Sequence, residues 1–508
     1  MDMRLEQTSF EAEIPCGGCK NRFTVEGDVT LPGSLRETTN ILHASAMAVV
    51  ESAEASQDRA TIAGRVIFCI LYTQGEHGTP ESIEAAADFT HLCDMPGTVP
   101  RSAVDAWAQA EHVTASVQNG RVSMKAVLSL CARAVCTQTA EALSAAKGDF
   151  VQQKTDQITL RRKTASGSAD TLLREEFSLP ADLAVTETLA AWADVQMLDA
   201  TGGQGRIGLS GEVTLTVAHA SSQPGRPLIM TRHTIPVGES VEVAGDGGDM
   251  LRGRIRVKDV AVASQDLGDG ERTLRAEVLL GMNAWAEREE IVAVLADAYT
   301  TSGEALRLNR APMTLRTGGS QQHIAESGKA SLLLPDGAKP LRTVLAAFAR
   351  PSLGSFIQQG SRLIAEGTME VDLVYMSDGD QPVSARVEVP FRTAFAATAA
   401  PEDILTLRAV GVEAVPITSD RAELRYILQA DIESQNAAPV SLVTEGLAVP
   451  ADAPSGNIIL YFTQPGESAW DIARRYRIPE SDLRALNPDL TGEPKPGQGL
   501  VIWHKNLA

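Results

Sequence analysis

Six cysteines are the residues of this 508-residue chain whose positions most readily suggest chemistry. All of them lie in the first 136 residues: Cys16, Cys19, Cys69, Cys93, Cys131 and Cys136. Two glycines separate Cys16 from Cys19, which suits one half of a zinc site, but no second pair has comparable spacing to complete it. Residues 1–10 are mixed and charged, without the apolar core of a signal peptide, so we expect a reducing cytoplasm and free thiols. A redox pair or a late cross-link stays open.

Other catalytic patterns are missing from the sequence. The eight histidines are scattered without the paired helical spacing that holds a catalytic metal, and no Gly-x-Ser-x-Gly elbow is present. Residues 245–249 are rich in glycine, but they have neither a lysine partner nor a following helix, so they predict a turn. Acidic pairs such as Glu289–Glu290 are typical of solvated faces, and spacing alone cannot identify the two facing carboxylates of a glycosidase. We therefore expect no enzyme activity, no bound metal and no cofactor.

The elements that could position a functional surface are clearest in the last fifty residues, 457 to about 504. An apolar strand at 458–462 is followed by a tight turn at 464–467. Ser468 can cap a helix and Asp471 can bond back to it, as in a capping box. Trp470, Ala473 and Tyr476 then recur at helical spacing and predict one buried face.

A second short helix and a closing strand complete this segment. Pro479 restarts the chain, and the helix that follows carries Leu483 and Leu486. The Asn487–Pro488 pair ends it, because the residue before a proline is pushed out of the helical region. A loop at 489–499 leads to a strand at 500–503, so the predicted order is strand, helix, helix, strand.

This pattern resembles the LysM domain. The matching positions are Gly466, Glu467, Ser468, Ile472, Ala473, Tyr476, Leu483, Asn487, Gly497, Gln498, Leu500 and Ile502. The resemblance implies a shallow groove for glycans that contain N-acetylglucosamine, between the first turn and the loop after the second helix. Carried over, the groove residues would be Gly466, Glu467, Ser468, Ala469 and Trp470 on one wall and Asn487, Pro488, Asp489 and Leu490 on the other. Glu467 stands where Asp is common and Ser468 where Thr is common, which bears on glycan affinity and leaves the fold intact.

Structural roles compete with these binding roles. Trp470 can equally be a core residue, because large aromatics dominate the burial of small cores. Asn487 can be a helix-end cap and Ser468 an N-cap, since no histidine or cysteine lies near Ser468 in the sequence. His504 is expected to be a solvated tail residue.

Length and charge limit the function of the rest of the chain. A chain of 508 residues suggests about three or four domains. The terminal segment has six acidic and six basic residues, so the net charge of −20 falls on the preceding body. An acidic body argues against nucleic acid and against anionic lipid as partners. No run of apolar residues approaches the ~18 that a membrane helix requires.

The body consists of three copies of one unit. Each opens with a Leu-Pro pair, and a glycine follows 32 or 33 residues later: Leu31–Pro32 with Gly64, Leu179–Pro180 with Gly211, and Leu334–Pro335 with Gly367. Each glycine begins a strand of alternating apolar residues that ends eight residues on, at Tyr72, His219 and Tyr375. Units of about 150 residues are too long for solenoid repeats and read as tandem domains, each mostly antiparallel β.

The offsets predict β domains at 1–158, 159–313 and 314–449, a linker at 450–456 and the terminal module at 457–508. Gly- and Ser-containing stretches at 165–169 and 317–320 are predicted to be further linkers. The Ala-rich stretch at 139–146 is consistent with a short helix. For 285–306 both a helix over 288–297 and an extended conformation fit the pattern, and the extended one is favoured.

This architecture resembles SipL-like spore-coat assembly proteins, which carry SPOCS (sporulation cell-surface) domains followed by a LysM domain. The resemblance rests on the strands after Gly64 and Gly367, on residues 295–299 (Leu-Ala-Asp-Ala-Tyr) and on the domain order, while His219 departs from the tyrosine of the other copies. It implies a sandwich-like β fold and a mother-cell protein at the forespore surface. There the LysM domain would bind a coat morphogenetic ATPase.

Two functions remain open at this point. One is a non-enzymatic scaffold of the spore coat or envelope whose LysM domain docks onto that ATPase. The alternative is a peptidoglycan-binding protein of the spore cortex or cell wall. A wall hydrolase with a LysM anchor would need a catalytic domain, for which the repeated body leaves no room.

Overall fold

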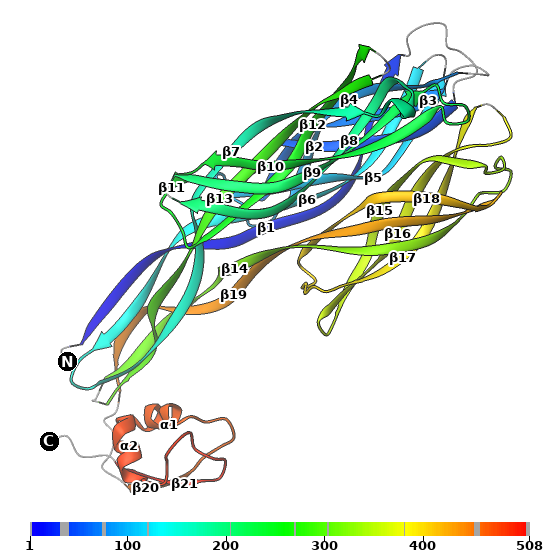
Figure 1. The fold of residues 1–508 in the computed structure, drawn as a ribbon. Helices are drawn as coiled ribbons and strands as arrows, with labels where there is room; N and C mark the ends of the chain where they lie inside the picture. Colours follow the sequence, from blue (N-terminus) through cyan, green and yellow to red (C-terminus); the bar gives the residue numbers. More distant parts are fainter. Residues whose placement is uncertain are drawn as a thin grey trace.

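The computed structural model describes residues 3–30, 40–73, 78–118, 121–203, 205–268, 271–301, 304–379, 381–451 and 458–503. Its body is built from antiparallel strands that form three units, and a small module with two helices follows at the C-terminal end (Figure 1). The predicted fold class, mostly β with three tandem sandwich-like domains and a βααβ module, is confirmed.

Each unit pairs two antiparallel sheets face to face. Unit 1 contains β1 (Arg4–Thr30), β2 (Asn40–Ser56), β3 (Arg59–Thr73), β4 (Pro80–Asp94), β5 (Ala103–Gln118) and β6 (Arg121–Lys147). Its strand orders are β1-β6-β5 and β2-β3-β4, and side chains from both sheets share one apolar core. This is the sandwich arrangement in which the inner faces of two sheets interdigitate.

Units 2 and 3 repeat this order. Unit 2 contains β7 (Val151–Leu179), β8 (Val185–Gly203), β9 (Arg206–Ser221), β10 (Leu228–Glu242), β11 (Ala244–Gly245), β12 (Met250–Gly268) and β13 (Glu271–Thr300), with a 3-10 turn at Ala181–Leu183. Unit 3 contains β14 (Glu304–Leu333), β15 (Thr343–Gln359), β16 (Arg362–Met376), β17 (Pro382–Phe395), β18 (Ile404–Thr418) and β19 (Arg421–Pro450). The strands predicted after the repeated glycines are the central strands β3, β9 and β16, and their alternating side chains are buried as predicted.

The repeated glycine has a steric cause. Gly64 of β3 pairs with Val50 at a β-bulge of β2, where the register shifts by one residue. A Cβ at Gly64 would run into the carbonyl oxygen of Val49 and lie 2.8 Å from the ring of Phe89. Gly367 repeats this arrangement with Ser352 and Phe391. Glycine is therefore required because a backbone and an aromatic ring approach the strand closely.

The first and last strands of every unit continue beyond the sandwiches and form a common stalk. In Figure 1 these long strands, β1, β6, β7, β13, β14 and β19, run together toward the terminal module. One apolar cluster joins them across all three units, with members such as Phe10, Leu160 and Leu315 that are at most 6% exposed. The three units therefore share a core and form one body rather than three separately packed domains.

A cyclic set of hydrogen bonds also joins the units. Strands β5, β8 and β18 are edge strands, whose free carbonyl groups need partners when they are covered. One long side chain from each unit donates to such a carbonyl of the next unit: Gln109 to Leu407 at 2.9 Å, Arg408 to Val195 at 3.1 Å and Arg256 to Ala106 at 3.0 Å. The order runs from unit 1 to 3, from 3 to 2 and from 2 to 1, so each unit is bonded to both of the others.

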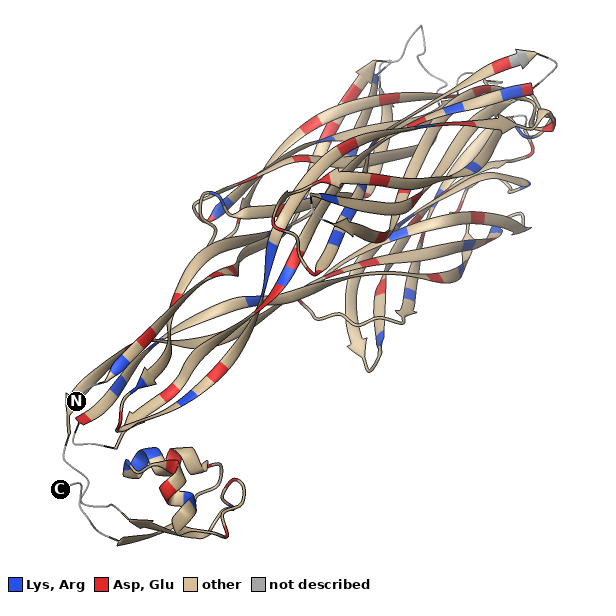
Figure 2. Cartoon of the chain, turned by 60° about the vertical axis from the view of Figure 1, so that its left-hand side comes forward, with Lys and Arg blue, Asp and Glu red and all other residues tan. Residues whose placement is uncertain are grey.

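Ion pairs between units line a central cavity of about 1250 Å³. In its wall Arg254 of unit 2 bridges Asp105 of unit 1, at 2.7 Å, and Glu433 of unit 3, at 2.5 Å. Figure 2 shows acidic and basic residues interleaved along the strands of the body rather than gathered on one face. Other charged residues of the cavity wall pair within one unit, such as Lys258 with Asp170 and Arg408 with Asp431.

The interface between units 1 and 3 contains a buried histidine. His43 contacts the carboxylate of Asp372 at 2.8 Å and stacks on Phe348 with ring centroids 3.7 Å apart. Burial lowers the pKa of His43, so its Nδ1–H donates to Asp372 from a neutral ring. Burial alone would raise the pKa of Asp372, but hydrogen bonds from His43 and Arg386 hold it below its usual range.

Several sequence predictions about connections are wrong. The expected linkers at 165–169 and 317–320 lie inside β7 and β14, and the expected helix at 139–146 is part of β6. The predicted boundaries at 158/159 and 313/314 also fall inside β7 and β14, whereas these strands begin at Val151 and Glu304. The predicted extended conformation of 285–306 is confirmed in its described residues, which belong to β13 and β14. Residues 31–32, most of the 450–456 linker and His504 lie outside the described residues.

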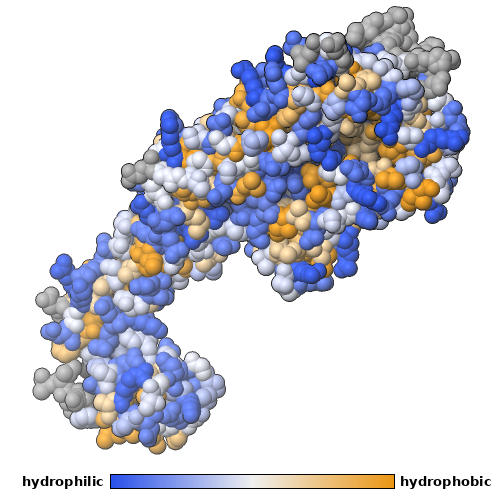
Figure 3. Space-filling model, viewed as in Figure 1, coloured by the Kyte–Doolittle hydropathy of each residue, from blue (hydrophilic) through white to orange (hydrophobic). Residues whose placement is uncertain are grey.

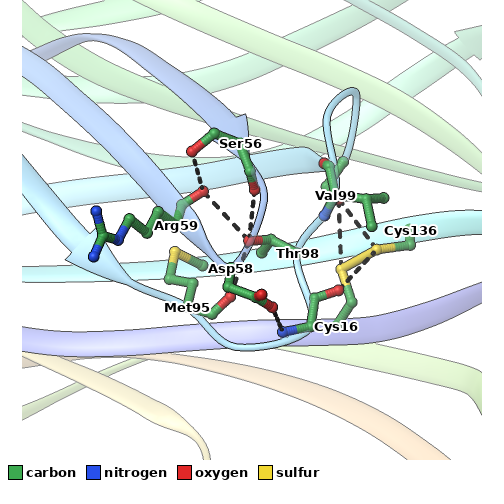
Figure 4. Close-up of a disulfide and its surroundings, with 10 residues drawn as sticks. Cys16, Ser56, Asp58, Arg59, Met95, Thr98, Val99 and Cys136 are labelled. Atoms are coloured by element: carbon green, nitrogen blue, oxygen red, sulfur yellow. Dashed lines mark hydrogen bonds between the residues drawn. A yellow bond between two sulfur atoms is a disulfide. The ribbon is translucent and has the colours of Figure 1, made fainter.

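The expectation of six free thiols is also wrong. Cys16 and Cys136 form a disulfide that joins β1 to β6 (Figure 4). Cys16 lies at a β-bulge between Pro15 and Gly17, which brings it toward the position of Cys136 on the partner strand. A turn at 95–99 covers the bond, and the Ser102 hydroxyl lies 3.1 Å from the Cys136 sulfur. The four other cysteines, all within the described residues, are free.

Candidate binding site at the terminal module

The terminal module has the predicted order of elements. It consists of β20 (Ile458–Phe462), α1 (Ala469–Tyr476), α2 (Glu480–Leu486) and β21 (Gly499–Trp503), and β20 pairs with β21. Ser468 is the N-cap of α1: its hydroxyl accepts from the Asp471 backbone N–H, and the Asp471 carboxylate accepts from the Ser468 N–H at 3.1 Å. The predicted capping box is therefore confirmed, and it fixes the entry into the helix.

The first wall of the predicted groove is a turn held by its own side chains. Gly466 is exposed and has a φ of +83°, which favours glycine. The Glu467 carboxylate accepts from the Tyr461 hydroxyl at 2.6 Å, from the Gln464 backbone N–H at 2.9 Å and from Arg475 at 2.6 Å. Hydrogen bonds from Tyr461 and Gln464 lower the pKa of Glu467 to about 2. Glu467 thus remains ionised and shapes the turn.

The second wall combines a structural residue with exposed ones. The Asn487 side chain donates to the carbonyls of Leu483 and Val501 at 2.8 Å each and accepts from the Val501 N–H at 2.7 Å. It therefore ties α2 to β21, in line with its predicted role as a helix-end cap. Pro488 and Asp489 are exposed, while Leu490 is buried in the module core.

The first wall contacts the loop that follows the second wall. The N–H of Ala469 donates to the Glu493 carboxylate at 2.9 Å, and Ala469 shares the module core with Leu490. Members of the two predicted walls therefore lie on neighbouring parts of the module. Gly466, Pro488 and Asp489 present exposed surface there, whereas Glu467, Ala469 and Asn487 are engaged inside the module.

Trp470 contacts the tip of the stalk. Its ring packs edge-on against Tyr299 with centroids 4.9 Å apart, and its Nε1–H donates to Asp297 at 2.8 Å. Arg474 donates to the same Asp297 oxygen at 2.8 Å. Tyr299 is itself part of the module core, and its hydroxyl donates to the Ile478 carbonyl at 2.8 Å. Trp470 is thus half-buried at an interface between the module and the body.

The face of the module that points away from the stalk is apolar. Figure 1 places β20 and β21 on that side, and Figure 3 shows apolar surface along the lower edge of the module. Ile459 and Tyr461 pack inward, whereas Ile458, Leu460 and Phe462 are 75%, 62% and 57% exposed. An outward strand face in a small two-stranded sheet is ordinarily polar, so this patch is typical of a contact surface.

Among the described residues, no three His, Cys, Asp or Glu side chains are grouped so that they could hold a metal ion. In the same part of the chain, no helix combines the length and the apolar composition needed to cross a membrane.

Fold and tip geometry together define a class: a body of three β-sandwich units that carries a small βααβ module at the end of a shared stalk. Residues 38–118, which span β2 to β5, match the family described as the SPOCS domain of SipL. Residues 461–503 match the LysM domain family. The chain is therefore similar to SipL-like proteins that combine SPOCS and LysM domains, as the sequence resemblance indicated. No curated protein and no solved structure matches the chain.

Sequence reasoning missed the residues that anchor the module. Asp297 and Tyr299 were noted only as part of a family-like ending, and Arg477, which bonds the Thr300 carbonyl at 3.2 Å, carried no signal. Glu493 lies in a loop without helical or strand periodicity. An aspartate and a tyrosine directly after the apolar run 291–296 were the one available hint of a polar contact.

Proposed function

We propose that this protein is a non-enzymatic assembly scaffold of the spore coat or envelope, located in the mother-cell cytoplasm at the forespore surface. In this role the LysM module docks onto a coat morphogenetic ATPase, and the three SPOCS-like units hold the module away from the body. The SPOCS and LysM family matches support a sporulation protein with a binding module. The ATPase and the location follow from the resemblance to SipL-like proteins.

One observation favours a protein partner over a glycan: the exposed apolar face formed by Ile458, Leu460 and Phe462. A hydroxyl-rich polymer gains little binding free energy by covering such an apolar face. The buried centre of a protein interface, in contrast, is itself apolar and aromatic. Trp470, the aromatic residue of the predicted groove, is meanwhile engaged by Asp297 and Tyr299.

The test is a pull-down of the ATPase with the full chain and with a form that lacks residues 457–508. We expect binding to the full chain and its loss on deletion. Binding that survives the deletion would rule out the module as the point of attachment. A second comparison uses Leu460→Ser with Phe462→Ser against the control Leu447→Ser, a leucine of the stalk that is 52% exposed. Only the module variant should weaken capture.

The alternative function, binding of peptidoglycan, rests on the exposed surface of Gly466, Pro488 and Asp489 on the two groove loops. Co-sedimentation of the full chain with purified peptidoglycan at physiological salt separates the two functions. Sedimentation that Pro488→Ala with Asp489→Ala abolishes would support the glycan function, and failure to sediment would remove it.

A further inference from the structure

Strands β1 and β4 of unit 1 belong to opposite sheets and face each other in a regular ladder. Phe23 packs against Phe89 with ring centroids 5.4 Å apart. Two residues along each strand, the Asn21 amide nitrogen lies 3.1 Å from His91 Nε2. The next step of the same ladder pairs Cys19 with Cys93, and the Asn21 amide also reaches the Cys93 sulfur at 4.0 Å.

The two thiols at this step are reduced and adjacent. Both pack in one apolar cluster with Ala60, Ile62 and Leu130. Cys93 is fully buried, whereas Cys19 keeps some exposed surface. A reagent can therefore reach Cys19 first.

Packing alone does not require cysteines here. The same ladder positions hold Ala169 and Val241 in unit 2 and Gln322 with Phe395 in unit 3. Other residue types thus fill the equivalent space between the sheets, and the thiol pair is particular to unit 1. Unit 1 also carries the Cys16–Cys136 disulfide, three residues from Cys19.

We propose that Cys19 and Cys93 are a second cross-linking site, which a small-molecule disulfide such as oxidised glutathione converts to an intersheet disulfide. The Cys19 thiol loses its proton to solvent, its sulfur attacks the glutathione disulfide, and one glutathione thiolate leaves. The Cys93 sulfur, deprotonated in turn, attacks the Cys19 sulfur of the mixed disulfide and displaces the second glutathione. Two protein thiols are oxidised, and one glutathione disulfide is reduced to two thiols.

The geometry also excludes the other free thiols as partners. Cys131 is the register partner of Lys20, so its side chain emerges on the opposite face of the sheet from that of Cys19. Cys69 belongs to a different cluster, with Leu42 and Leu71.

The cross-link forms slowly at neutral pH. Burial, with a contribution from Cys93, raises the pKa of Cys19 to about 12. Because the thiolate is the attacking species, the rate should rise about tenfold with each pH unit below that value.

The experiment incubates the purified full chain with excess oxidised glutathione at pH 8.5 and then alkylates the remaining thiols. Alkylation should label four cysteines before oxidation and two, Cys69 and Cys131, afterwards. Trypsin leaves Cys16 and Cys19 together in the peptide 5–20, which the first disulfide already links to the peptide 134–147. The new disulfide should add the peptide 66–101, which contains Cys93, and so give a species of three linked peptides.

Variants assign the new bond. Cys93→Ala should abolish the three-peptide species, and Cys69→Ala, a matched buried thiol, should leave it unchanged. Cys19→Ala provides the same answer if Cys93→Ala fails to fold. The oxidised wild type should also melt several degrees higher than the reduced form. Three outcomes would overturn the proposal: all four thiols remain open to alkylation, glutathione stays bound as a stable adduct, or Cys19 becomes linked to Cys131.

Discussion

Replacing the repeated glycines by alanine tests the steric argument for the three-unit repeat. Gly64 and Gly367 occupy equivalent positions opposite a β-bulge, each beneath a phenylalanine ring. An added Cβ would meet a carbonyl oxygen well inside contact distance and the ring at 2.8 Å. At Gly211 the same atom would lie 2.6 Å from the Gln196 carbonyl oxygen and 3.3 Å from the flexible end of Ile255.

The expected magnitudes follow from these distances. Overpacking a well-packed core costs about 1–3 kcal/mol, and at Gly64 a rigid carbonyl and a ring must both move, so we expect about 3 kcal/mol or more. For a body of about 450 residues that unfolds as one, that loss corresponds to a melting temperature lower by about 3 °C. Gly211→Ala should lose less, because only one rigid atom crowds it. Gly238→Ala is the matched control, since no described atom lies within 4 Å of its Cβ and its φ is not positive.

The assay is thermal unfolding of the full chain, followed by the far-ultraviolet circular dichroism of its strands. The order of stability should be Gly238→Ala closest to wild type, then Gly211→Ala, then Gly64→Ala and Gly367→Ala together. Gly238→Ala should stay within about 0.5 kcal/mol. A Gly64→Ala variant as stable as Gly238→Ala, or less affected than Gly211→Ala, would refute the reasoning.

Three more outcomes are expected. Burial lowers the pKa of His219 from 6.5 to about 4, so the folded state binds its proton less readily than the unfolded chain does. Wild type should therefore lose stability as pH falls from about 6.5 to 4, by up to about 3 kcal/mol, whereas His219→Gln should lack this component in pH-dependent urea melts. Asp297→Ala removes the acceptor of Trp470 and Arg474, so protease should cleave between body and module faster while the melting of the body is unchanged. Arg254→Ala leaves two carboxylates of units 1 and 3 without their bridging cation. Because both carboxylates are partly exposed to solvent, urea unfolding should show a loss of about 1–3 kcal/mol or separate transitions for the units.

The sequence predicted the central strands because their signal is local. In β3, β9 and β16 the side chains alternate between two environments, and the glycine marks a bulge that all three units need. The module was equally accessible, since its turns, caps and apolar positions all lie within fifty residues. Local agreement of propensity, capping and pattern is what makes such elements predictable.

The stalk could not be predicted in the same way. Stretches 165–169 and 317–320 contain glycines that suggested flexible linkers, but a Cβ at Gly319 would lie 2.7 Å from the Ser434 carbonyl, and one at Gly167 would overlap the Glu242 carbonyl. These glycines are present because another backbone passes close to the strand, and that backbone is more than seventy residues away in the chain. The same holds for Cys16 with Cys136, which are 120 residues apart. Composition cannot distinguish close approach from flexibility.

The identity of the groove residues depended on distant chain as well. Asn487 and Ser468 kept the structural roles that their positions favoured. The sequence allowed Trp470 to be either a core residue or an aromatic platform for a ligand. Its hydrogen-bond partner Asp297 lies 173 residues earlier in the chain, at the tip of the stalk. No pattern inside the module carries that information.

The anchoring of Trp470 has a consequence for how the module recognises a partner. Asp297, Tyr299 and the carbonyl of Thr300 all hold the helical side of the module, so that side is directed at the stalk. The stalk itself derives its rigidity from a core that all three units share. A module on a flexible tether samples many orientations, whereas a module fixed in this way presents one face in one orientation. The fixed module therefore loses less orientational freedom when it binds a partner. Such an arrangement suits the proposed scaffold function, in which the module has to present its contact face to a partner in one orientation.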